Sequence, residues 1–163
     1  MNVSEPEVHP CQRLARQKEL AHVEQIWPSL SLWEARTLAD GVNPPAQEAK
    51  ILIVDDERPI VETLRYNLER IGHWVCAAYD GREAIAVAKR ERPDVIVLDV
   101  MLPIIDGFSA CGLIRSLMDV PIILLTAKGT ERDKITGFQV GAADYVTKPF
   151  VLKELMERVL GYL

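Results

Sequence analysis

Five polar side chains of this sequence each follow a short run of residues typical of a buried β-strand. They are Asp55 and Asp56 after 51–54, Asp99 after 95–98, Thr126 after 122–125, and Lys148 after 145–147. Three carboxylates brought together repel one another and raise one another's pKa unless a cation is present. Mg²⁺ prefers oxygen ligands and can bridge a carboxylate site to a phosphoryl group. These residues therefore predict a magnesium site for phosphate chemistry, provided that the fold brings them together.

The kind of phosphate chemistry is narrowed by what the sequence lacks. It contains neither a G-x-x-x-x-G-K-[ST] loop nor a G-x-G-x-x-G turn, so stable nucleotide binding is not indicated. What remains is attack of a carboxylate on phosphorus, which gives an aspartyl phosphate. The alternative for each polar residue taken singly is a solvated strand end that binds nothing.

The elements that must position these side chains alternate along the second part of the chain. Solid aliphatic runs at 51–54, 95–98 and 122–125 are typical of parallel strands buried on both faces, and 74–78 and 144–146 are expected as two more strands. Apolar residues at helical spacing predict five helices, at 59–71, 82–90, 108–117, 131–139 and 151–163. Five βα units favour an α/β fold with a doubly wound parallel sheet, whose strands all end at one edge.

The first part of the chain has a different character. Apolar residues at helical spacing and a Ser-x-x-Glu capping box at Ser31 and Glu34 predict a helical hairpin over 1–41. Residues 42–49 contain two adjacent prolines and predict a linker, which leaves 50–163 as the main domain. Because the hairpin carries Trp27 and Trp33, we expect it to pack on the main domain or on a second copy of the chain.

Composition excludes several classes of function. A formal net charge of −5 disfavours direct DNA binding by this chain, because gripping a nucleic-acid backbone needs a basic face. No apolar run approaches the roughly 20 residues of a membrane span, and the acidic start does not resemble a signal peptide, so we expect no membrane association and a cytoplasmic location. The three cysteines lack C-x-x-C spacing, which favours inert thiols over disulfides or zinc.

Five segments in order resemble the receiver domain of bacterial two-component response regulators. They are 50–57 (KILIVDDE), 94–103 (DVIVLDVMLP), 106–108 (DGF), 121–127 (PIILLTA) and 141–150 (GAADYVTKPF). The resemblance covers 50–163 and implies a flavodoxin-like (βα)5 fold with strand order 2-1-3-4-5. It also implies a cis peptide bond between Lys148 and Pro149.

The resemblance implies a role for each polar residue. Asp99 would be the phosphoacceptor. Four groups would hold Mg²⁺: the carboxylates of Asp55, Asp56 and Asp99, with Asp56 a more direct ligand than Asp55, and the backbone carbonyl of Met101. Lys148 would pair with Asp99 at rest and with a phosphoryl oxygen afterwards, while the Thr126 hydroxyl and the Ala127 N–H would contact other phosphoryl oxygens.

A switch is also implied. The new charge on Asp99 would draw Thr126 inward, and Tyr145 would then rotate from exposed to buried, which remodels the face formed by the fourth helix, fifth strand and fifth helix of the domain. The simpler interpretation of Tyr145 is a packing residue. Partners implied are a sensor histidine kinase upstream and, downstream, an output that controls transcription.

The region 126–158 is most similar to receivers of the winged-helix transcription-factor class, whose active dimers join through that face. Lys134 with Glu154, and Asp144 with Arg158, could pair across a two-fold axis. The alternative is that these are ordinary solvated helix charges.

Two other functions stay open. A phosphorylation-independent scaffold could keep the fold and signal by protein contact alone. A haloacid-dehalogenase-type phosphatase also uses a strand-end Asp and Mg²⁺, but it would need a second Asp where Met101 stands. Under the receiver interpretation the protein is not an enzyme with turnover, since it catalyses only its own modification.

Overall fold

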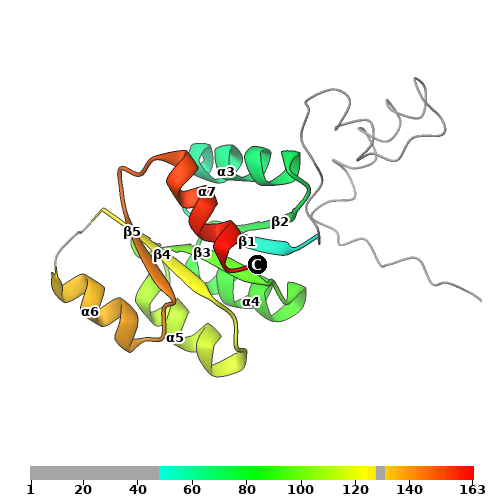
Figure 1. Ribbon diagram of the computed structural model, residues 1–163. Coiled ribbons are helices and arrows are strands. Elements are labelled where there is room, and N and C mark those ends of the chain that lie inside the picture. The colour runs from blue at the N-terminus through cyan, green and yellow to red at the C-terminus, as the bar shows by residue number, and fades with distance from the viewer. Residues whose placement is uncertain (1–47, 128–130) are drawn as a thin grey trace, which may run out of the picture.

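The alternating pattern of the sequence forms a five-stranded parallel sheet covered by five helices (Figure 1). The computed structural model describes residues 48–127 and 131–163, with the backbone alone for 131–134. The strands are β1 (Lys50–Val54), β2 (Trp74–Ala78), β3 (Val95–Asp99), β4 (Ile122–Thr126) and β5 (Asp144–Thr147). The helices are α3 (Arg58–Arg70), α4 (Gly81–Glu91), α5 (Gly107–Leu117), α6 (Glu131–Gln139) and α7 (Leu152–Gly161).

The strand order is β2-β1-β3-β4-β5, and every neighbouring pair is parallel. This confirms the flavodoxin-like fold and the 2-1-3-4-5 order. The predicted helical hairpin at 1–41 and most of the linker lie outside the described residues. Glu48 and Ala49, the last two residues of the predicted linker, contact β2: the Ala49 carbonyl accepts the Trp74 N–H at 2.7 Å.

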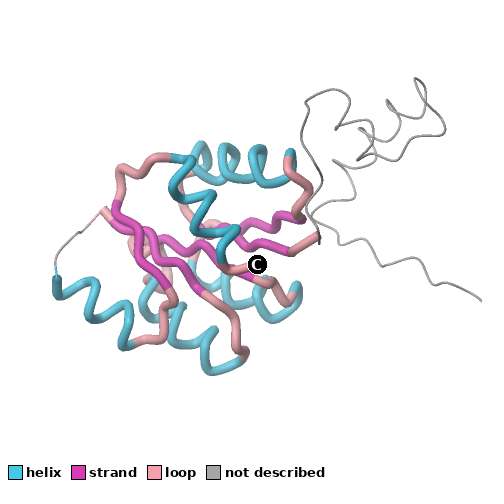
Figure 2. The backbone as a smooth tube through the Cα atoms, viewed as in Figure 1, coloured by secondary structure: helices cyan, strands magenta, loops and turns pink. Residues whose placement is uncertain are grey.

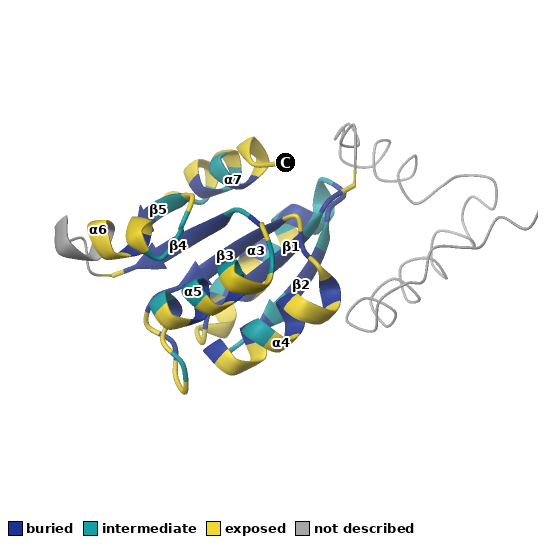
Figure 3. Cartoon of the chain, turned by 90° about the horizontal axis from the view of Figure 1, so that it is seen from below, coloured by how far each residue is buried: buried dark blue, intermediate teal, exposed yellow. Residues whose placement is uncertain are grey.

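Helices cover both faces of the sheet (Figures 1 and 2). This explains why the central strands consist almost entirely of aliphatic residues. Alternate residues of each strand point to opposite faces, so Ile51 and Ile53 join one core and Leu52 and Val54 the other. Helices α3 and α7 cover the first face, and α4, α5 and α6 lie on the second (Figure 1). Figure 3 shows the central strands buried between helices that keep exposed outer surfaces.

Strand register brings the polar residues to one edge. Val54 of β1 pairs with Leu98 of β3, so the next residue of each strand is a carboxylate, Asp55 beside Asp99. Thr126 ends β4 opposite Thr147 of β5, and Lys148 follows. The carboxyl edge therefore collects residues that are far apart in the sequence, as the parallel-sheet rule requires.

The junction after β3 is held by a cap and a glycine. Asp106 accepts hydrogen bonds from the Ser109 N–H at 3.1 Å and the Ser109 hydroxyl at 2.7 Å, which lower the pKa of Asp106 and begin α5. A Cβ at Gly107 would overlap the backbone carbonyl oxygen of Asp99. Only glycine allows α5 to start this close to the end of β3. Among the described helices, none has the length and apolar character needed to span a bilayer.

Candidate functional site

Three carboxylates converge where β1 and β3 end. One oxygen from each of Asp55, Asp56 and Asp99 lies within 4.8 Å of the other two. Asp55 and Asp99 are buried, at 0% and 2% exposure, whereas Asp56 is exposed. A set of three carboxylate oxygens with one member open to solvent fits a hard divalent cation that keeps several waters, such as Mg²⁺. The structure thus brings together the three predicted carboxylate ligands.

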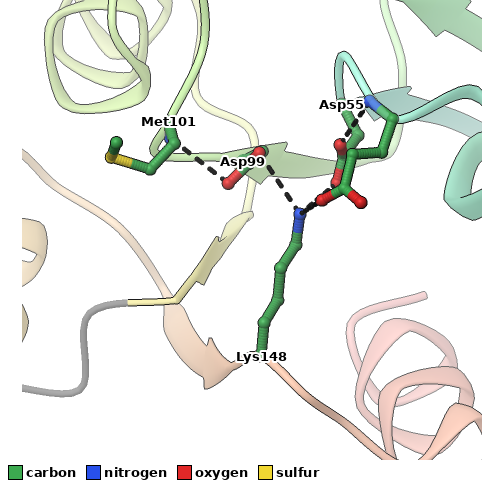
Figure 4. Close-up of polar contacts among 5 residues, drawn as sticks. Asp55, Asp99, Met101 and Lys148 are labelled. Atoms are coloured by element: carbon green, nitrogen blue, oxygen red, sulfur yellow. Dashed lines mark hydrogen bonds and ion pairs between the residues drawn. The ribbon is translucent and has the colours of Figure 1, made fainter.

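Lys148 reaches into this cluster from the end of β5 (Figure 4). Its Nζ lies 2.7 Å from Asp55 Oδ2, 3.1 Å from Glu57 Oε1 and 3.3 Å from Asp99 Oδ2. The Lys148–Pro149 peptide bond is cis, as the resemblance implied. The predicted contact with Asp99 is present, but Asp55 is the nearest partner, although β1 lies farther from β5 in the sheet than β3 does.

Both buried carboxylates also accept a backbone N–H from two residues later in the chain. The Glu57 N–H donates to Asp55 Oδ1 at 2.9 Å, and the Met101 N–H donates to Asp99 Oδ1 at 3.2 Å (Figure 4). Each carboxylate thus has one oxygen toward Lys148 and one oriented by the backbone. The Met101 side chain is 53% exposed, and its carbonyl as a metal ligand remains a prediction.

The electrostatics of the cluster are unbalanced. Burial alone would lower the pKa of Lys148, but the hydrogen bond to Asp55 and the charges of Asp99 and Asp55 raise it above its usual value, so the ammonium stays protonated. Burial raises the pKa of Asp55, and the hydrogen bonds from Lys148 and the Glu57 N–H oppose this rise. The carboxylates of Asp55, Glu57 and Asp99 contact the Lys148 ammonium, and Asp56 lies close to Asp55 and Asp99, so this excess of negative charge favours a divalent cation.

The other predicted phosphoryl contacts come from β4. Thr126 ends the strand with its side chain fully buried, and its backbone carbonyl accepts the Lys148 N–H at 2.7 Å. Ala127 follows and is exposed. Thr126 and Lys148 are therefore tied to each other through the backbone, on adjacent strands of the same edge.

Tyr145 occupies an intermediate position. It is partly buried and packs against the core on the α4–α5 side of the sheet. A Cβ at Gly137 of α6 would lie 3.4 Å from the Tyr145 ring and 3.0 Å from a Leu124 methyl carbon. The small residue in α6 therefore lets the helix pack closely beside this ring. Both interpretations of Tyr145, packing residue and switch, are compatible with this position.

The charges predicted for a dimer face are engaged within the chain. Arg158 donates to Asp144 at 2.9 and 3.1 Å and to Glu154 at 3.0 Å. The Asp144–Arg158 pair expected across a two-fold axis thus forms inside one subunit, because β5 and α7 are neighbours in the fold. The Lys134 side chain lies outside the described residues. Pairing between two copies stays a prediction.

Sequence reasoning missed one member of the site. Glu57 was not assigned a role, yet its carboxylate binds Lys148. The available signal was its place in the Asp-Asp-Glu run after β1, two residues beyond a strand end. That position alone does not distinguish it from a helix N-terminal residue, and Glu57 is also the N-cap of α3.

Comparisons with known proteins agree with this geometry. Residues 51–160 match the family model of the response regulator receiver domain. The chain is similar to the receiver domain of the Francisella response regulator 1452, with 35% identity and a TM-score of 0.67 over 71% of this chain and 96% of that one. It is similar to the Vibrio cholerae chemotaxis protein CheY4, with 35% identity and a TM-score of 0.68 over 72% of this chain and 100% of that one.

A third similar structure is the BeF3-activated DrrB receiver domain, with 34% identity and a TM-score of 0.65 over 71% of this chain and 97% of that one. The family model matches more than half of the chain, and the sheet order and the acidic edge are those that the resemblance implied. The chain belongs to the response regulator receiver domain family.

Proposed function

We propose that this chain accepts a phosphoryl group on Asp99 from a sensor histidine kinase, in the presence of Mg²⁺, and passes the signal on through the face formed by α6, β5 and α7. Receiver domains in general interact with histidine kinases, which supports the choice of donor. The observation that carries the proposal is the placement of Asp99. It is a buried carboxylate beside two further carboxylates and an ammonium.

The chemical step follows from these groups. A carboxylate oxygen of Asp99 attacks phosphorus, a P–O bond forms, and the bond from phosphorus to the donor breaks. The leaving group departs with the bonding electrons. It is an imidazole nitrogen when the donor is a phosphohistidine and a carboxylate when the donor is an acyl phosphate. Lys148 stays charged and neutralises the incoming phosphoryl oxygens, while Thr126 and the Ala127 N–H supply further donors.

The metal site would be formed by Asp55, Asp56 and Asp99, with the Met101 carbonyl as a further ligand. A bound Mg²⁺ would screen the repulsion among these carboxylates and the negative charge of the phosphoryl group. Asp56 is the exposed member and therefore the one most open to a hydrated ion. The DrrB receiver in its BeF3-activated form supports a phosphoryl mimic as a probe for this chain.

The output would begin at Thr126 and Tyr145. The hydroxyl moves toward the phosphoryl group, and the ring of Tyr145 moves toward the vacated space, which changes the face of α6, β5 and α7. We further propose that this face controls dimerisation in the manner of the winged-helix class, with Lys134, Glu154, Asp144 and Arg158 near the contact. DNA binding would belong to another domain, in the cytoplasm, and this chain would catalyse only its own modification.

The direct test is incorporation of phosphate from radiolabelled acetyl phosphate with Mg²⁺. We expect incorporation of one phosphoryl group per chain. No incorporation is expected when EDTA removes Mg²⁺ before the reaction, or in the variant Asp99→Asn. Asp119→Asn makes the same chemical change at an exposed site and should label like wild type. Labelling that survives Asp99→Asn would refute the assignment. Turnover of many equivalents of a phosphate ester would favour the phosphatase alternative.

A further inference from the structure

We propose that Glu57 is a positioning residue that competes with Asp99 for the Lys148 ammonium at rest and so restrains phosphoryl acceptance. The inference rests on the proposed function of Asp99. A lysine ammonium has three N–H donors and no acceptor. In this structure Lys148 contacts three carboxylates, and the distance from Nζ is greatest for Asp99, at 3.3 Å. Asp55 and Glu57 thus share the resting ammonium with Asp99.

Glu57 is suited to this role because it is anchored twice. Its backbone N–H donates to Asp55 Oδ1 at 2.9 Å, and its carboxylate accepts from Lys148 at 3.1 Å. Although Glu57 is the N-cap of α3, its side chain makes no capping hydrogen bond. Its substitution therefore removes the contact with Lys148 without removing a cap from the helix.

When Lys148 turns from the Asp99 carboxylate to a phosphoryl group on it, the ammonium shifts, and one of its contacts with the other two carboxylates must lengthen. Asp55 is fully buried, and separating it from the ammonium would leave an uncompensated buried charge, which is costly. The Glu57 side chain is 61% exposed and can be resolvated when it lets go. Glu57 is therefore the contact that is released, and its attraction for Lys148 opposes the phosphorylated state.

Removal of this carboxylate releases one Lys148 donor in advance, so that the ammonium can turn toward the phosphoryl group without losing a contact. We expect Glu57→Gln and Glu57→Ala to bind beryllofluoride in the presence of Mg²⁺ about twofold to fivefold more tightly than wild type, the range for one largely exposed ion pair. The same variants should reach half-maximal labelling at a correspondingly lower acetyl phosphate concentration, with a smaller change in the maximal rate.

The matched control is Glu62→Gln. Glu62 lies on α3, is 60% exposed and pairs with Arg65 at 3.5 Å, so this variant makes the same charge change at equal exposure without touching Lys148. A general electrostatic effect of the lost charge would appear in both variants. A specific effect through Lys148 appears only at Glu57, and it disappears when Glu57→Gln is combined with Lys148→Ala.

The experiment is isothermal titration calorimetry of beryllofluoride binding in the presence of Mg²⁺. The proteins are wild type, Glu57→Gln, Glu62→Gln, Lys148→Ala and the double variant Glu57→Gln/Lys148→Ala. Thermal unfolding checks that each variant is folded. Equal affinities for wild type and Glu57→Gln, weaker binding by Glu57→Gln, or an equal gain in Glu62→Gln would overturn the inference while leaving the proposed function intact. Failure of the proposed function is a different result, namely wild type that neither binds the mimic nor labels on Asp99.

Discussion

The two edges of the sheet both contain a lysine among acids, but their charge balance differs. At the amino edge, the Lys50 ammonium donates to the Glu91 carbonyl at 2.8 Å and lies 3.8 Å from the Glu91 carboxylate. Arg90 contacts the same carboxylate at 2.8 Å, so two cations lie beside one buried carboxylate. At the carboxyl edge, Lys148 contacts three carboxylates, and Asp56 lies close to two of them.

The difference separates a structural ion group from a reactive one. At the amino edge the buried Glu91 carboxylate is compensated by two cations, and the Lys50 side chain joins the start of β1 to the end of α4. The backbone N–H of Lys50 also donates to Asp94 at 2.7 Å. Excess acid at the carboxyl edge costs folding free energy unless a cation is bound. Such a cost is retained where a metal and a phosphoryl group are to be received. The charge imbalance of the carboxyl edge therefore supports placing the proposed phosphoryl chemistry there.

The largest effect should come from sterics at the carboxyl edge. In Gly107→Ala the new methyl overlaps the Asp99 carbonyl oxygen, and we expect a loss of about 3 kcal/mol or more in the free energy of unfolding. Gly112→Ala in the same helix has open space around its Cβ and should stabilise by about 0.5–1 kcal/mol. Urea denaturation measures both. Equal stabilities would contradict the close junction between β3 and α5.

The charge comparison is tested by removing each lysine. Lys148→Ala leaves buried carboxylates without their ammonium and should lose about 3 kcal/mol without Mg²⁺, part of which Mg²⁺ restores. Lys50→Ala leaves Arg90 on Glu91 and should lose about 1 kcal/mol, regardless of Mg²⁺. Urea denaturation with Mg²⁺ or EDTA measures this. The same Mg²⁺ response in both variants would show that the two edges do not differ as described.

The smallest effect is a pH dependence at the amino edge. His73 is buried, and its Nδ1 accepts the Ala49 N–H at 3.3 Å. Burial lowers the pKa of His73 below its usual value of about 6.5, and the negative charge of Glu48 opposes this shift. The unfolded chain therefore binds this proton more readily, so the stabilisation is fully present above about pH 6.5 and decreases as pH falls toward the folded-state pKa.

His73→Gln should accordingly show a shallower decline of the urea midpoint between about pH 7.5 and 5.5 than wild type. Both proteins are measured with saturating Mg²⁺, so that the charge state of the carboxyl edge is the same in each. The difference between their slopes of urea midpoint against pH then reports on His73. Identical slopes would mean that the buried imidazole does not resist protonation.

Most of the fold could be predicted from the sequence. The aliphatic runs predicted every strand end to within one residue, and α6 was predicted at its observed bounds, because burial on both faces of a sheet and helical periodicity are local patterns. Helix α7 ends at Gly161, two residues before the prediction. Strand order came from the resemblance to the family, since local patterns do not encode which strands pair.

The sequence by itself determined which residues could act, because each lies at the end of a strand and parallel strands end together. Tertiary structure alone decided the pairing among them. Lys148 lies nearest Asp55, Glu57 joins the site, and Arg158 is engaged within its own chain. The reason is that ion pairing depends on competition among all charges within a few ångströms, and that competition exists only once distant segments have been folded together.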